Sequence, residues 1–136
     1  MLAKYGQSWI LFAFVSAVGW GVWGFFSAKA SKGTSPVALW ATVVVIEGIV
    51  ALPVFLKYRP VLSTFAILSA LSGAVGYLFF FIALRDGSAP TVVAITATYP
   101  LITLVLNIVA NGYRPHLREV AGVVMAVGAI YLLSSG

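Results

Sequence analysis

Glu47 is the one carboxyl side chain that lies inside a long apolar stretch of this chain. It stands eleven residues after Pro36 and nine before Leu56, near the middle of a segment long enough to span a membrane. A charged residue at that depth costs about 2.5–3.5 kcal/mol on insertion scales, so such residues usually face a cavity or a partner. A carboxyl in apolar surroundings also holds its proton more tightly, which suits exchange of a proton for a cation. Glu47 is therefore a candidate for proton coupling and substrate binding; the structural alternative is a protonated carboxyl hydrogen-bonded to a neighbouring helix.

Aromatic side chains accompany this carboxyl at helical spacing. Trp40 lies two turns before Glu47 on the same helix face. Trp20 and Trp23 fall on one stripe of the first apolar stretch, and Tyr77 lies in the third. Indole faces attract cations and aromatic solutes, so we predict that these aromatic residues line a substrate cavity. Anchoring at the membrane interface is the alternative for tryptophan.

A stripe of polar side chains follows in the fourth apolar stretch. Offsets of 0, 3, 7 and 11 residues, the spacing of one helix face, relate Thr96, Tyr99, Thr103 and Asn107. Pro100 lies within this stripe and has no N–H to donate to the carbonyl of Thr96, which adds an acceptor there. We predict that the stripe lines the pocket. Hydrogen bonding across a helix interface is the alternative.

Small residues three or four positions apart mark faces on which helices approach one another closely. Such pairs occur in the first, third and fifth apolar stretches. We predict helix packing or a dimer seam on the faces that carry Gly21, Gly24, Gly73, Gly76, Gly122 and Ala126.

The composition indicates which elements must position these residues. Hydrophobic residues make up 62% of the 136 residues and charged residues only 8%, and the mean hydropathy is +1.08. Soluble domains carry roughly 25% charged residues, and lipid admits only helices or closed barrels. The apolar runs are continuous rather than alternating, which excludes a barrel pattern. We predict an all-α integral membrane protein with one domain over residues 1–136, a bundle of five transmembrane helices at about 9–28, 36–56, 63–84, 90–110 and 117–133.

Two of these spans have features that compete with a membrane crossing. The last has only fourteen uninterrupted apolar or small residues, from Val120 to Leu133, and needs residues 117–119 to reach the membrane surface. The first imitates a signal peptide through Lys4 and the tripeptide at 28–30. Its apolar core of about eighteen residues is longer than the usual 7–15, which favours a membrane helix.

Several classes of chemistry are not expected. The chain has no cysteine, one histidine and three acids, too few ligands to predict a metal site. It has no phosphate-binding glycine loop with a lysine, so ATP-driven transport by this chain alone is not expected. His116 lies in a loop beside Arg114 and Arg118, and we expect it to be solvated. We predict no enzyme activity, no cofactor and no nucleic-acid partner, because the basic residues flank apolar runs as headgroup anchors.

Lysine and arginine are distributed unequally between the two sides of the predicted bundle. Five fall on the side of the N-terminus and three on the other: Lys4, Lys57, Arg59, Arg114 and Arg118 against Lys29, Lys32 and Arg85. The positive-inside rule then predicts a cell (inner) membrane protein with a cytoplasmic N-terminus and an exterior C-terminus. So small a bias is also what insertion in both orientations would show.

The third and fourth stretches carry a family resemblance. An aromatic-rich run from Tyr77 to Leu84 is followed by the hinge Arg85-Asp86-Gly87-Ser88-Ala89-Pro90 and by a span that contains Pro100. The opening Gly19-Trp20-Gly21-Val22-Trp23-Gly24 and the later Gly122 add to the pattern. The chain resembles the EamA-type domain of the drug/metabolite transporter superfamily. That resemblance implies one five-span half of a fold that most relatives build from two inverted halves with ten spans, and it implies small metabolites, amino acids or lipophilic cations as substrates.

Two departures from the family pattern remove charges. Members often carry Gly-Glu-Arg before the last span, where this chain has Gly112-Tyr113-Arg114. Members also often carry an arginine in the second span, where this chain has Thr42 and, further in, Glu47. The charged details of a family mechanism are therefore not carried over.

These observations predict a secondary transporter of small metabolites or lipophilic and aromatic cations. It would work in the lipid bilayer as a homodimer of five-span protomers, antiparallel or parallel. The alternatives are a non-transporting membrane subunit and a half-transporter that pairs with a different polytopic protein.

Overall fold

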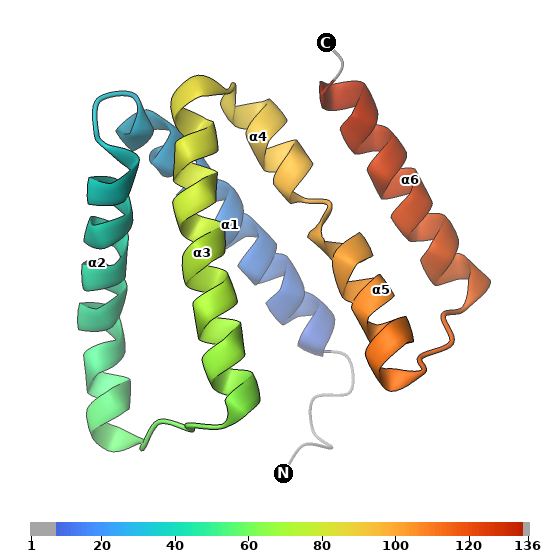
Figure 1. Ribbon diagram of the computed structural model, residues 1–136, viewed down its shortest axis with the longest axis horizontal. Coiled ribbons are helices and arrows are strands. Elements are labelled where there is room, and N and C mark those ends of the chain that lie inside the picture. Colours follow the sequence, from blue (N-terminus) through green and yellow to red (C-terminus); the bar gives the residue numbers. More distant parts are fainter. Residues whose placement is uncertain (1–7, 135–136) are drawn as a thin grey trace. The chain divides into compact units, whose positions relative to one another are not determined.

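The computed structural model describes residues 8–134, and all regular structure in that range is helical (Figure 1). Helices satisfy their own backbone hydrogen bonds, which long apolar segments in lipid require. The predicted all-α class is therefore confirmed for the described residues. The helices are α1 (Ser8–Ser31), α2 (Pro36–Lys57), α3 (Thr64–Asp86), α4 (Ala89–Thr96), α5 (Tyr99–Asn111) and α6 (Leu117–Ser134). They form two compact units that meet in the chain after Asp86, and the single domain stays a prediction.

The first unit contains α1, α2 and α3. α2 and α3 are antiparallel neighbours, and α1 packs against α3 (Figure 1). α2 begins at Pro36, which suits a first helical turn, although the Ser35 side chain makes no capping hydrogen bond. α3 has a serine cap, because the Ser63 hydroxyl oxygen accepts the Ala66 N–H at 3.2 Å.

The second unit contains α4, α5 and α6, and α6 packs against α4. Ser88 caps α4, since its hydroxyl oxygen accepts the Thr91 N–H at 3.3 Å. α5 ends at Gly112, whose φ of +62° is the left-handed conformation that glycine adopts without a steric penalty. The chain then turns back and begins α6 at Leu117.

The fourth predicted span is not one continuous helix. α4 ends at Thr96, and the N–H of Thr98 donates to the carbonyl of Ile95 at 3.1 Å in a tighter turn. Pro100 cannot donate to the Thr96 carbonyl, the bond that a continuous helix needs, and its ring disfavours helical backbone in the preceding residue. The predicted stripe is thereby divided, with Thr96 on α4 and its other three members on α5.

Four helical segments of the described chain are long and apolar enough to cross a membrane: Trp9–Ser31, Pro36–Lys57, Thr64–Asp86 and Ala89–Asn111. α6 is not among them, so the fifth crossing stays a prediction. Most large apolar side chains of the described helices are exposed, including Leu56 at 77% and Val109 at 78%. Lipid or a partner protein must cover such a surface, which makes this a multi-pass membrane protein. Lys4, one of the charges in the predicted topology, lies outside the described residues.

Candidate functional site

An aromatic cluster joins α1 to α3 in the first unit. The Trp23 ring centroid lies 5.4 Å from that of Tyr77, 5.1 Å from that of Phe80 and 5.7 Å from that of Phe81. Phe81 is fully buried, whereas Trp23 and Tyr77 are half-buried. Stacked and tilted aromatic pairs of this kind stabilise a helix contact beyond the area they bury. The structure thus brings together two of the predicted cavity residues, Trp23 and Tyr77.

Trp40 connects α2 to α3, the helix that carries Tyr77. Its indole N–H donates to the Ala74 carbonyl at 3.1 Å, one turn of α3 before Tyr77. Trp40 is half-buried, whereas Trp20 is 63% exposed and is not buried with Trp23. Three of the four predicted aromatic residues therefore lie along the contacts that α3 makes with its neighbours.

Glu47 lies exposed on α2, and among the described residues its carboxylate makes no hydrogen bond or ion pair. Asp86, by contrast, forms an ion pair with Arg85, at 3.1 Å between carboxylate oxygen and guanidinium nitrogen. Glu47 lies two turns after Trp40 on α2 and has no described basic partner, so a cation could supply the missing positive charge.

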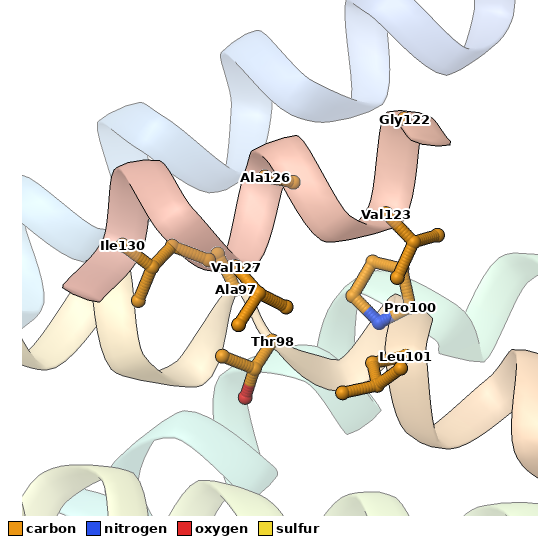
Figure 2. Close-up of a pocket in the computed structure, with 9 residues that line it drawn as sticks. All are labelled: Ala97, Thr98, Pro100, Leu101, Gly122, Val123, Ala126, Val127 and Ile130. Atoms are coloured by element: carbon orange, nitrogen blue, oxygen red, sulfur yellow. The ribbon is translucent and has the colours of Figure 1, made fainter. Parts of the chain in front are cut away.

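The second unit has a hollow beside the break between α4 and α5 (Figure 2). Its volume is about 240 Å³, and its lining is almost entirely apolar. Ala97, Pro100 and Leu101 lie on one side, and α6 faces them with the small residues Gly122 and Ala126. The Thr98 hydroxyl donates to the Ile95 carbonyl at 2.8 Å and the Thr96 hydroxyl to that of Val93 at 2.9 Å, so both hydroxyl protons are used within the turn.

A second and more polar hollow follows along α5. Its volume is about 400 Å³, and it is lined by Pro100, Thr103, Leu104, Asn107, Tyr113, Glu119 and Val123. It contains Thr103 and Asn107 of the predicted stripe, but not Thr96 or Tyr99. The Asn107 side-chain amide donates to the Thr103 carbonyl at 2.9 Å, and its oxygen accepts from Asn111 at 3.0 Å. Of the predicted stripe, only Thr103 and Asn107 on α5 line this hollow.

Tyr113 and Glu119 also line this hollow, and we did not predict either of them as a site residue. The Tyr113 hydroxyl lies 2.8 Å from both Glu119 carboxylate oxygens, and the His116 backbone N–H donates to the same carboxylate at 2.9 Å. The contact between the His116 N–H and Glu119 is half of a capping box at the start of α6. The sequence indicates it by an acid three residues after His116. His116 is exposed, as predicted.

The Glu119 carboxylate also alters the acidity of Tyr113. Accepting the phenolic hydrogen bond, it raises the pKa of Tyr113 above its ordinary value of 10.0. The contact is therefore present below that ordinary value and is lost as the pH rises through the raised one. At neutral pH the hydroxyl keeps its proton and donates it to the carboxylate.

Most of the glycines on the predicted small-residue faces do not closely contact another helix of their own unit. A Cβ added at Gly21, Gly73, Gly76 or Gly122 would meet no atom within 4 Å, because larger side chains make the helix contacts. Gly24 is buried. Within its own unit none of these four glycines closely approaches another helix, and both helix packing and a seam with a second chain stay predictions.

Comparison with known proteins identifies the family. Residues 7–135 match the EamA-like transporter family, nearly the full length of the chain. The chain belongs to that family. An uncharacterized protein of Methanocaldococcus jannaschii is 32% identical to this EamA-like chain over 131 residues, which are 92% of this chain and 95% of the relative. No solved structure matches it.

Family membership confirms the resemblance predicted from the sequence. It makes the chain a transporter-like membrane protein of the drug/metabolite superfamily, a class of transporters rather than of enzymes. The relative from Methanocaldococcus jannaschii has a similar length, consistent with a single EamA half.

Proposed function

We propose that the chain is a secondary transporter of small metabolites of the lipophilic or aromatic cation type, with Glu47 exchanging a proton for the substrate. The observation that carries the proposal is the exposed Glu47 side chain, which has no described ion pair or hydrogen bond and shares a helix with Trp40, the residue that bonds to α3 one turn before Tyr77. A carboxyl that binds either a proton or a cation couples the two fluxes without ATP.

The substrate class follows from the surroundings of this carboxyl. Trp23, Tyr77 and Phe80 present aromatic surface, and the Trp40 indole N–H is already bonded to the Ala74 carbonyl. Aromatic faces attract a desolvated cation by about 2 kcal/mol or more. A permanently charged ligand with an aromatic ring suits this environment better than an anion or a sugar.

The proposal includes a dimer, because a single protomer of this size has few helices with which to enclose a substrate cavity. The open glycine faces of α1 and α3 offer surfaces on which a second copy can approach closely. Two copies would supply the two halves that the ten-span relatives carry in one chain. The orientation of the two copies, antiparallel or parallel, is an outcome of the topology experiment in the Discussion.

Uptake into proteoliposomes tests the proposal. Benzyltrimethylammonium is a suitable probe, because its permanent charge prevents leakage as a neutral amine. We expect uptake driven by an outward proton gradient, and we expect Glu47→Gln to lower it at least ten-fold, because the amide cannot exchange a proton.

The matched control is Asp86→Asn, which removes an acid that is exposed and paired with Arg85. Its uptake should equal that of the unmodified chain. If Glu47→Gln keeps its pH-dependent uptake, Glu47 is not part of the mechanism. If the unmodified chain takes up no probe in either gradient direction, it is not a transporter of this class of cation.

A further inference from the structure

We propose that the polar hollow between α5 and α6 is a binding site for a primary ammonium ion with a small apolar body. The hollow lies in the second unit and shares no residue with the Glu47 site of the first. The proposal does not rest on transport, because binding at this hollow requires no proton gradient and no movement of the helices.

The charge of the hollow favours a cation. Glu119 is the one carboxylic acid that lines it, and neither Arg114 nor Arg118 forms an ion pair with it, although both are near in sequence. Among the described residues the one ion pair joins Arg85 to Asp86. The chain has a net charge of +5, yet within residues 8–134 no side chain forms an ion pair with this carboxylate, and the nearby His116 acts on it without one.

The hydrogen-bonding groups that remain are mostly acceptors. A carboxylate accepts about four hydrogen bonds, and Glu119 receives two donors, the His116 N–H and the single Tyr113 O–H that lies 2.8 Å from both of its oxygens. The Tyr113 oxygen has donated its proton and keeps its lone pairs, and the Asn107 side-chain oxygen accepts one bond from Asn111. No described hydrogen bond involves the Thr103 hydroxyl. An ammonium group with three N–H donors matches this set, whereas an anion does not.

The walls of the hollow indicate an organic ligand rather than a bare metal ion. Pro100 and Leu104 are apolar, and the hollow of about 400 Å³ is much larger than an ion. The described residues also contain no cluster of three or more metal-binding side chains. Small-molecule sites combine a mostly apolar concave wall with a few convergent polar groups, which is the arrangement here.

A protection experiment tests the site locally. The chain has no cysteine, so Leu104→Cys places a single thiol on the wall of the hollow. Phenethylamine, protonated at neutral pH, should slow maleimide labelling of this thiol in detergent at least five-fold. It should leave labelling unchanged at Val109→Cys, which is exposed outside the hollow.

Two further substitutions, each combined with Leu104→Cys, distinguish the effect of the charge at the hollow from that of a charge elsewhere in the chain. In Glu119→Gln the amide oxygen still accepts from the His116 N–H, so α6 keeps its cap while the charge is lost. The phenethylamine concentration needed for half-maximal protection should then rise at least ten-fold. Asp86→Asn removes a charge elsewhere and should leave protection unchanged. Equal protection in Glu119→Gln, loss of protection in Asp86→Asn, or equal protection by sodium chloride would each overturn the proposal.

The result can be told apart from that of the transport experiment. Benzyltrimethylammonium has the aromatic ring but no N–H donor, and it should protect the Leu104→Cys thiol at least ten-fold less well than phenethylamine. Equal protection by both would contradict recognition through hydrogen bonds. Failure of uptake with intact protection would reject the proposed function and leave this site standing.

Discussion

Among residues 8–134, two of the three acids form no ion pair, and they lie in different units. Asp86 pairs with Arg85 at the end of α3, whereas Glu47 lies two turns after Trp40 on α2 and Glu119 lines the polar hollow. Glu47 stood out in the sequence because it interrupts an apolar run. Glu119 did not, because an acid in the first turn of a helix is common and stabilises the helix dipole. Only its contact with Tyr113, six residues away across the turn, marks it as part of a site.

Trp40 provides a test of the contact between α2 and α3. Trp40→Phe keeps an aromatic ring but removes the indole N–H that donates to the Ala74 carbonyl. Hydrogen bonds between membrane helices contribute about 0.6–2 kcal/mol, so we expect a loss of about 1 kcal/mol of unfolding free energy. Thermal unfolding of the chain in detergent, followed by circular dichroism, measures it.

The control for this substitution is Trp9→Phe, at a tryptophan that is 65% exposed near the start of α1. The unfolding free energy of Trp9→Phe should change by less than half as much as that of Trp40→Phe. Equal stability of Trp40→Phe and the unmodified chain would show that the 3.1 Å contact contributes nothing to the α2–α3 pair.

At the scale of the helices, two prolines in apolar segments have different effects. α2 continues past Pro53 to Lys57, whereas the fourth span is divided between Thr96 and Tyr99, just before Pro100. Near Pro100 the hydroxyls of Thr96 and Thr98 bond to carbonyls of the preceding turn, which offers the backbone an alternative to the helix ladder.

We therefore expect Pro100→Ala to join α4 and α5. The new N–H at position 100 can donate to the Thr96 carbonyl, and hydrogen exchange should show its protection together with slower exchange at positions 97–99. If bending at this break is part of the transport cycle, uptake of benzyltrimethylammonium should fall at least five-fold while the protein stays folded.

Pro53→Ala is the matched control, because α2 is already continuous there. It should leave both uptake and the exchange of the fourth span unchanged. Rapid exchange at positions 97–100 in Pro100→Ala would show that the break does not depend on the proline ring.

At the scale of the whole molecule, the open glycine faces predict self-association. Gly122→Cys places a thiol at the rim of the hollow beside the α4–α5 break, where an added Cβ meets no atom within 4 Å, on the face predicted as a seam. A short bismaleimide should then cross-link two copies in native membranes. Gly33→Cys, in the loop between α1 and α2, is the control and should cross-link much less. Absence of any cross-linked dimer from Gly122→Cys would contradict a homodimer joined at this face.

Reporters on the C-terminus decide the orientation of the copies. A periplasmic and a cytoplasmic reporter, fused separately, should both be active if the two copies insert in opposite orientations. Activity of the periplasmic reporter alone would support the predicted exterior C-terminus and a parallel dimer. Activity of the cytoplasmic one alone would reject that topology.

Local properties of the chain account for most of what was predicted correctly. The apolar content and continuous runs predict helices in a membrane, because lipid leaves the backbone no other means of satisfying its polar groups. Pro36, Ser88 and Gly112 mark helix ends through the backbone conformations and caps that these residue types favour. The order of aromatic, glycine and proline motifs was enough to indicate the EamA-like family.

Contacts between distant residues required the tertiary structure. Helical spacing put Trp20 and Trp23 on one stripe, but the packing of α1 on α3 brings Trp23 to Tyr77 and leaves Trp20 mostly exposed. The polar stripe is divided locally, at the break before Pro100, but its members Thr103 and Asn107 share a hollow with Glu119 only because the chain turns back after Gly112. Spacing along a helix states which side chains share a face, and only the packing of one helix on another decides what that face meets.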